Sequence, residues 1–212
     1  MKSFKHVETL IDRYPKLIVC KKEIIRAYEL LEEAYIMGRK LLVCGNGGSA
    51  SDSEHIVGEL MKEFRLKRKV YADQAAAMKT IDTEMGSILA ENLQGALPAI
   101  CLTGHSALTT AFMNDANADL VFAQQVNGYG KENDVFLGIS TSGNSKNVCY
   151  AAITAKSKGL KVIGLTGQKE NQLEQYADVC IHVPETETFK IQELHLPVYH
   201  CLCLMLEDKF FG

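Results

Sequence analysis

The 212-residue sequence lacks the features that would place the protein in a membrane or on a nucleic acid. No stretch approaches the roughly 20 consecutive apolar residues that a membrane-spanning helix needs. The formal net charge of -3 provides no basic field of the kind that nucleic-acid binders usually carry. The first residues, MKSFKHVETLIDRYPK, are amphipathic and charged, without the apolar core of a secretory signal. We therefore expect neither a membrane nor a nucleic acid as partner.

The seven cysteines lack the spacing of a zinc finger or a disulfide framework. Their number is odd, no CxxC pair occurs, and most of them lie in apolar runs. Free cysteines in such runs behave as small hydrophobic side chains. We expect reduced core cysteines and a cytoplasmic location.

Length and composition predict one domain of the α/β class. With 47% hydrophobic and 23% charged residues, the chain is ordinary for a globular protein and long enough to bury a sizeable core. Five short apolar runs have the length of strands, and their lack of alternation is typical of strands buried on both faces. Helical stretches separate most of them, which predicts a doubly wound, five-stranded parallel sheet covered by helices on both faces. The expected strands are 40–44, 98–102, 134–139, 161–166 and 179–183, and the expected helices are 16–37, 50–64, 106–128, 146–158 and 187–208.

Two segments stand outside this alternation. Residues 1–38 are expected to form a helical N-terminal arm that ends at Gly38. Residues 65–96 have a helix-forming composition but a poor apolar stripe, and they fit the alternation of strands and helices least well. We expect them to form an insertion between the first and second strands. The basic run RLKRKV, which opens this insertion, is more typical of a solvated face than of a binding patch.

Three strands end in loops that combine glycine with hydroxyl residues: GNGGSAS (45–51), TGHS (103–106) and STSGNS (140–145). Open parallel sheets bind ligands beyond the carboxyl ends of their strands, where helix N-termini also point. Glycine lets the backbone approach a ligand closely, and the free amides and hydroxyls suit a phosphate monoester. One such loop is equally well explained as a turn with serine as helix cap. Two loops with the hydroxyls of Ser49, Ser140, Ser142 and Ser145 favour a phosphate site.

The glycine pattern argues against a nucleotide cofactor. The first loop does not match GxGxxG, and no lysine follows it as in GxxxxGK[ST]. Dinucleotide binding and nucleoside triphosphate hydrolysis are therefore disfavoured.

Histidines and carboxylates follow the first loop and recur near the C-terminus. His55 and Glu59 lie four residues apart, on one face of the expected helix. Such a pair can share a metal ion or transfer a proton, although spacing alone favours an exposed ion pair. The stretch KIQELHLPVYH adds Gln192, Glu193, His195 and His200, and isolated histidines on such a helix are more often packed or surface residues than ligands.

The segments CGNGGSASDSEHIVGEL, LGISTSGNSKNV and IQELHLPVYH, in this order and at these separations, resemble the phosphoheptose isomerases. These enzymes have a SIS (sugar isomerase) domain, and the likeness covers roughly 16–64 and 97–208. It implies a single SIS domain over residues 1–212 and an aldose–ketose isomerase of sedoheptulose 7-phosphate and D-glycero-D-manno-heptose 7-phosphate. The reaction moves a proton between adjacent carbons through an enediol, and therefore requires an acid, a base and a group that polarises the carbonyl.

The resemblance also implies a site, position by position. Glu59 and His200 would be the catalytic acid–base pair. One zinc ion per subunit would be held by His55, Glu59, Gln192 and His200. The phosphorylated sugar would be bound by Asn46, Gly47, Gly48, Ser49, Asn114, Asp115, Ser140, Thr141, Ser142, Ser145 and Gln192.

The spacing of two of these residues bears on the assembly. Gln192 and His200 are eight residues apart, about 12 Å along a straight helix. Both reach one ion only if the helix bends, as Pro197 between them could cause, or if a neighbouring subunit supplies one of them. The second arrangement predicts a homo-oligomer with active sites at its interfaces, in agreement with the homotetramer that the resemblance implies.

Two other functions stay open. A SIS domain can bind a sugar phosphate or a replication initiator without catalysis, but such a protein would not need the four zinc-ligand residues together. An isomerase of another phosphosugar is the second alternative. The chain has Glu63 and Phe189 where the family usually has an arginine and an aspartate that touch the sugar.

Overall fold

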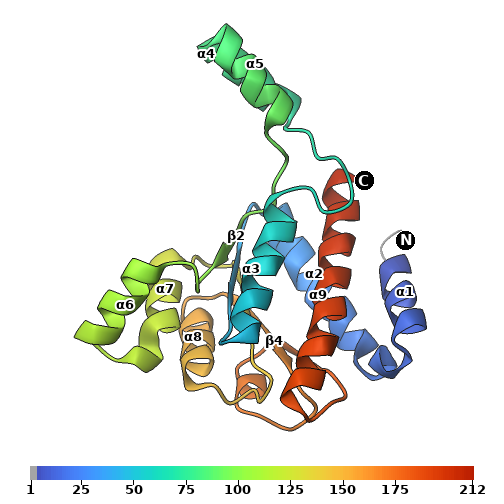
Figure 1. Ribbon diagram of the computed structural model, residues 1–212, viewed down its shortest axis with the longest axis vertical. Coiled ribbons are helices and arrows are strands. Elements are labelled where there is room, and N and C mark those ends of the chain that lie inside the picture. Colours follow the sequence, from blue (N-terminus) through green and yellow to red (C-terminus); the bar gives the residue numbers. More distant parts are fainter. Residues whose placement is uncertain (1–3) are drawn as a thin grey trace.

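The computed structural model describes residues 4–212, and a five-stranded parallel sheet forms their centre (Figure 1). The strand order is β2-β1-β3-β4-β5, with every neighbouring pair parallel. The chain therefore builds outward from β1 in both directions, and the order reverses between β1 and β3. The strands are β1 (Leu41–Cys44), β2 (Ala99–Cys101), β3 (Val135–Ile139), β4 (Lys161–Thr166) and β5 (Val179–His182).

Helices cover both faces of this sheet. The α-helices are α1 (Lys5–Arg13), α2 (Lys21–Ile36), α3 (Gly48–Met61), α4 (Ala72–Ile81), α5 (Thr83–Asn92), α6 (Ser106–Asp115), α7 (Val121–Tyr129), α8 (Lys146–Ser157) and α9 (Thr188–Phe211). The 3-10 helices are η1 (Pro15–Cys20), η2 (Ala118–Leu120) and η3 (Leu173–Gln175).

Each strand divides its side chains between two apolar layers, because successive residues of a strand point to opposite faces. Leu41 and Val43 pack in the layer that holds α1, α2, α3 and α9. Leu42 and Cys44 pack in the opposite layer, with α7 and α8. Burial on both faces explains why the strands read as unbroken apolar runs.

The predicted fold is confirmed, with two helices broken where the sequence suggested one. The expected helix 16–37 is divided into η1 and α2, with Pro15 in the first turn of η1. The expected helix 106–128 stops at Asp115 and restarts through η2, because the Asn117 side chain accepts a hydrogen bond from the Asp119 amide at 2.9 Å. An asparagine that bonds its neighbouring backbone in this way offers the chain an alternative to the helix. Residues 1–3 of the predicted arm lie outside the described residues.

The insertion forms a helical hairpin, α4 and α5, that projects from the body of the molecule (Figure 1). The prediction of a solvated basic run is wrong for Arg68, which is 2% exposed, although Lys67 and Lys69 on either side of it are exposed. Arg68 is buried because Glu207, on α9, provides it with a buried carboxylate partner at 2.8 Å.

No helix among residues 4–212 is long and apolar enough to cross a membrane. All seven cysteines are free, and all except Cys101 are buried. The expectation of unpaired core cysteines is therefore confirmed.

Candidate active site

The first glycine loop joins β1 to α3 at the point where the strand order reverses. Gly47 has a φ of 55°, in the left-handed region that favours glycine. Ser49, in the first turn of α3, is 3% exposed, and its carbonyl accepts a 2.8 Å hydrogen bond from the Ser53 hydroxyl. The helix N-terminus and the open backbone of Gly47 leave amide groups available to an anion, whereas Gly48 packs against the Gln192 side chain.

The second loop, between β3 and α8, forms a compact hydroxyl cluster. The Ser140 and Ser145 hydroxyl oxygens lie 3.0 Å apart, and the Gly143 amide donates to the Ser140 hydroxyl at 3.1 Å. Gly143 has a φ of 65°. Thr141 and Ser142 line a hollow of about 300 Å³ beside this loop. Four hydroxyls therefore gather at the N-terminus of α8.

A pair of asparagines ties the two loops together. Asn46 and Asn147 exchange two side-chain hydrogen bonds, both of 2.9 Å. Gly45, Asn46, Gly47 and Asn147 line a second hollow, of about 260 Å³. The N-termini of α3 and α8, which carry partial positive charge, thus open at the same edge of the sheet. The phosphate site at this edge of the sheet stays a prediction.

The expected substrate residues Asn114 and Asp115 lie apart from the loops. They are exposed at the end of α6, where the Asn114 amide donates to the Asp115 carboxylate at 2.9 Å. Their neighbours Met113 and Ala118 line the 260 Å³ hollow, but Asn114 and Asp115 do not. Their role stays a prediction.

A cluster of titratable side chains occupies the contact between α3 and α9. His55 Nε2 lies 3.1 Å from Glu59 Oε1, so the predicted i,i+4 pair forms. The ring centroids of His55 and His200 are 5.0 Å apart, with the rings nearly perpendicular. The structure therefore brings His200 next to the pair of His55 and Glu59, which precedes it by more than 140 positions in the sequence.

Burial gives this cluster its electrostatic character. Desolvation lowers the pKa of His200, and the neighbouring His55 lowers it further, so both disfavour the protonated form of this imidazole. The side-chain atoms His200 Nε2 and Glu59 Oε2 are both buried and have no hydrogen-bond partner among the described residues. The nearest cation to Glu59 Oε2 is Lys62 Nζ, at 3.8 Å. A hydrogen bond to a ligand, or a metal ion, could therefore satisfy both atoms.

Two members of this cluster were not predicted from the sequence. The Tyr199 hydroxyl lies 3.0 Å from His55 Nδ1 and donates to Asp52 Oδ1 at 3.2 Å. Burial raises the pKa of Asp52. Asp52 stands three residues before His55, on the same side of the helix, and that spacing was the available signal. Nothing in the sequence indicates that Tyr199 reaches His55, because this contact depends on how α9 packs on α3.

The fourth predicted zinc ligand lies elsewhere. Gln192 packs against the start of α3, where a Cβ added to Gly48 would be 2.5 Å from Gln192 Nε2. Gly48 and His55 are seven residues apart on α3, about 10 Å along the helix. Helix α9 runs through Pro197 without interruption. Gln192 is therefore positioned beside the first glycine loop, away from His200.

The donor set suits zinc in its chemistry, because imidazole and carboxylate are common zinc ligands. The unpartnered atoms of Glu59 and His200 fit the same purpose. Within residues 4–212, however, no group of three or more His, Cys, Asp or Glu side chains is arranged to hold a metal ion. Zinc binding therefore stays a prediction.

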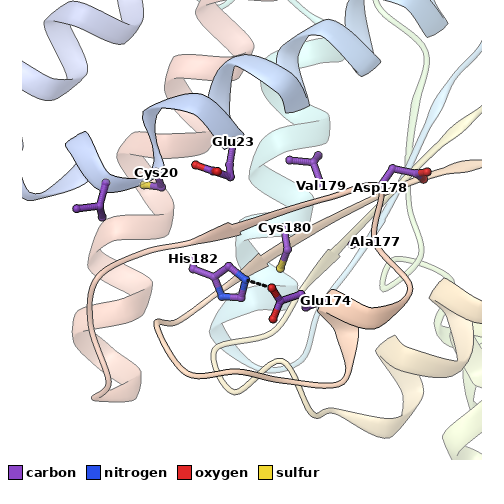
Figure 2. Close-up of a pocket in the computed structure, with 9 residues that line it drawn as sticks. Cys20, Glu23, Glu174, Ala177, Asp178, Val179, Cys180 and His182 are labelled. Carbon is purple, nitrogen blue, oxygen red and sulfur yellow. Dashed lines mark ion pairs between the residues drawn. The ribbon is translucent and has the colours of Figure 1, made fainter.

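A separate cavity of about 470 Å³ lies beside β5, a strand at the end of the sheet order (Figure 2). Its lining includes Cys20 and Glu23 from the N-terminal helices, and Cys180 and His182 from β5. His182 forms a 3.3 Å ion pair with Glu174 there. None of the predicted site residues lines this cavity.

The fold, with its glycine- and serine-containing loops at the carboxyl ends of β1 and β3, is that of the SIS-domain class. A family model of the SIS domain matches residues 95–205. The phosphoheptose isomerase of Clostridium acetobutylicum is 37% identical over 191 residues, which cover 90% of this chain and 84% of that protein. The solved phosphoheptose isomerase of Francisella tularensis has a TM-score of 0.73 and 29% identity, covering 95% of this chain and 94% of that one. The phosphoheptose isomerase structure from Neisseria gonorrhoeae has a TM-score of 0.70 and 30% identity, with coverages of 95% and 98%.

These similarities extend over nearly the whole chain, beyond the SIS domain itself. The chain belongs to the phosphoheptose isomerase family.

Proposed function

We propose that this protein is a phosphosugar aldose–ketose isomerase that interconverts sedoheptulose 7-phosphate and D-glycero-D-manno-heptose 7-phosphate. The observation that carries the proposal is the cluster of His55, Glu59 and His200 between α3 and α9, in which Glu59 is buried and the His55 side chain is 42% exposed. A protein that only binds a sugar phosphate has no need of such an acid–base pair. Family membership supports the same reaction.

The chain supplies the chemistry of proton transfer. The hydroxyls of the second loop and the amides at the start of α3 would hold the phosphate. The Glu59 carboxylate would remove the proton from the carbon next to the carbonyl. His200 would donate a proton to the carbonyl oxygen, which gives the enediol. Glu59 would then give its proton to the neighbouring carbon, while the hydroxyl on the carbon that first lost a proton returns a proton to His200, which forms the new carbonyl and restores both residues.

We also propose one zinc ion per subunit, held by His55, Glu59, Gln192 and His200. When bound, zinc polarises the carbonyl oxygen of the substrate. In one chain, Gln192 lies beside Gly48 while His200 lies beside His55. This separation supports a homotetramer in which a neighbouring subunit completes each site. The free, mostly buried cysteines are consistent with a cytoplasmic enzyme.

The test is the turnover of sedoheptulose 7-phosphate by the wild type, Glu59→Gln and His200→Ala, with zinc measured in the same samples. Loss of the base should lower kcat by about a hundredfold or more. The matched control is Glu91→Gln on α5, an exposed glutamate whose side chain takes part in no described hydrogen bond or ion pair; its kcat should be unchanged.

The outcomes separate the proposed reaction from its alternatives. An inert wild type that turns over another sugar phosphate would replace the heptose assignment. A folded wild type that binds sugar phosphates without converting any of them would establish a binding role. A fully active Glu59→Gln variant would refute the assigned base.

A further inference from the structure

Tyr199 is a buried phenol whose hydroxyl is shared between two polar side chains of α3. The residue is 1% exposed. Its hydroxyl donates to Asp52 Oδ1 at 3.2 Å and lies 3.0 Å from His55 Nδ1. Asp52 and His55 are three residues apart on one side of α3, so a single hydroxyl from α9 bridges both of them. The proposed acid–base pair and the predicted zinc ligands include neither Tyr199 nor Asp52.

The number of hydrogens in this network decides which nitrogen of His55 carries one. A phenol has one hydrogen to donate, and a carboxylate only accepts. Because the Tyr199 hydroxyl gives its hydrogen to Asp52, its oxygen can only accept from His55. His55 Nδ1 therefore carries the hydrogen of the neutral imidazole, which leaves a lone pair on Nε2.

The lone pair of His55 Nε2 faces the proposed catalytic base. Nε2 lies 3.1 Å from Glu59 Oε1. The His55 side chain is 42% exposed, so a ligand can reach it from solvent. Two acceptors at this separation need a hydrogen donor or a cation beside them. A substrate hydroxyl or a metal ion meets that need.

The other tautomer of His55 would close this site. With its hydrogen on Nε2, His55 would donate to Glu59 Oε1 and form the hydrogen bond that i,i+4 spacing favours. The nitrogen would then have no lone pair for a ligand. The Tyr199 hydroxyl opposes this closed arrangement, because the hydrogen bond made by one ring nitrogen decides which of the two is protonated.

We propose that Tyr199, held by Asp52, is a positioning residue for His55. It fixes the tautomer and the orientation of the ring, so that Nε2 presents its lone pair beside Glu59. Metal-ligating histidines donate their second ring N–H to a carboxylate, a backbone carbonyl or water, and that partner orients the ring. Here the phenol oxygen takes that place. The inference deepens the proposed function and rests on it, since Nε2 is the atom with which His55 would hold zinc.

The first experiment determines the tautomer without any ligand. Chemical shifts of the ring nitrogens in isotope-labelled protein distinguish a nitrogen that carries hydrogen from one that has a lone pair. They are recorded at alkaline pH, where imidazoles are neutral, and the signals of His55 are those absent from His55→Gln. We expect Nδ1–H in the wild type and Nε2–H in Tyr199→Phe, which keeps the buried ring. The control Tyr35→Phe removes another buried hydroxyl, bonded to the Pro98 carbonyl, and should keep Nδ1–H.

The second experiment measures zinc affinity by competition with a chelator. Loss of a partner that orients a metal ligand weakens metal binding by about 10–100-fold. Tyr199→Phe should show this decrease, and Tyr35→Phe should show none.

Asp52→Asn tests the hydrogen count in the same two measurements. Its amide can donate to the Tyr199 oxygen, which frees the hydroxyl hydrogen for His55 Nδ1. We expect the hydrogen of His55 to move to Nε2 and zinc affinity to fall, as in Tyr199→Phe.

The outcomes separate this inference from the proposed function. A hydrogen that moves from Nδ1 to Nε2 in Tyr199→Phe supports the positioning role, even in a protein that neither binds zinc nor turns over a sugar phosphate; such a protein would refute the proposed function alone. The positioning role is overturned if His55 of the wild type carries its hydrogen on Nε2. It is also overturned if Tyr199→Phe, or Asp52→Asn where Tyr199→Phe does not fold, keeps Nδ1–H, or if the wild type binds zinc and Tyr199→Phe binds it as tightly.

Discussion

Replacing Arg68 should destabilise the protein more than replacing any exposed arginine. The Arg68 side chain is fully buried, with its Nε donating to Glu207 Oε1 at 2.8 Å. Its Nη1 and Nη2 donate to the carbonyls of Leu60 and Glu59 at 2.8 and 2.9 Å, which satisfies the end of α3. Its guanidinium also lies 4.7 Å from the centre of the Phe211 ring.

The size of the effect follows from what Arg68→Met leaves behind. The Glu207 carboxylate stays fully buried and keeps only the Phe64 and Arg65 amides as donors, at 2.9 Å each. An uncompensated buried charge costs about 3–5 kcal/mol. For a chain of this length each kcal/mol lowers Tm by about 2–4 °C, so we expect a decrease of roughly 6–20 °C.

The second substitution tests the reason for that decrease. Glu207→Gln keeps an oxygen for the two amides but removes the charge, so Arg68→Met/Glu207→Gln should recover part of the stability that Arg68→Met loses. Urea unfolding, followed by circular dichroism, measures the free energy of unfolding of the wild type, of the two single variants and of the double variant. Arg65→Met is the control. Its side chain is 55% exposed and pairs with Asp208 at the surface, so it should cost less than about 1 kcal/mol. The reasoning fails if Arg68→Met costs no more than this control, or if the double variant is as unstable as the sum of the single variants.

Four further predictions follow from buried groups and loops. Burial lowers the pKa of His195 from 6.5 to about 4. Because the unfolded state binds a proton on His195 at a pH where the folded state does not, the free energy of unfolding should fall by roughly 3 kcal/mol as the pH drops from 6.5 to about 4. In acid titrations, His195→Leu should show a smaller decrease. Gly143→Ala should raise KM for the phosphosugar at least several-fold, since φ is 65° there and the new Cβ would overlap the Asn171 side chain; an unchanged KM would contradict the role of this loop. Chelation of bound zinc should lower turnover and added zinc should restore it, and an enzyme that keeps full activity after its zinc has been removed would exclude the proposed metal. Burial raises the pKa of Cys20 and Cys180 to about 11, so a thiol reagent should label both slowly at neutral pH in the folded protein and rapidly in urea.

The sheet could be predicted from the sequence because its signal is local and repeated. Strands buried on both faces must be apolar at every position, and Leu41–Cys44 and Val135–Ile139 are. The glycine loops after them were also visible, because a positive φ at Gly47 or Gly143 restricts the residue type at that position. The break between α6 and α7 could not be predicted, because the capping hydrogen bond of Asn117 competes with an otherwise acceptable helical sequence.

The buried ion pair between Arg68 and Glu207 could not be predicted from the sequence. Arg68 lies in a run that is basic and otherwise exposed, and no local pattern separates it from Lys67 and Lys69. Its burial depends on Glu207, 139 positions away on α9. The same holds for the hydrogen bond between His55 and Tyr199, which requires α9 to pack on α3 in one particular register.

The sequence by itself determined the class of fold and the position of the two loops that combine glycine with hydroxyl residues, because both depend on residue type and short-range spacing. The phosphate site at these loops and the acid–base pair of Glu59 and His200 stay predictions. Only the tertiary structure decided which of those residues meet. It placed His200 beside His55 and Gln192 beside Gly48, and it directed the apolar face of α5 toward solvent. Contacts between helices are set by how their side chains pack across a shared core, and neither propensity nor periodicity within one helix specifies the partner.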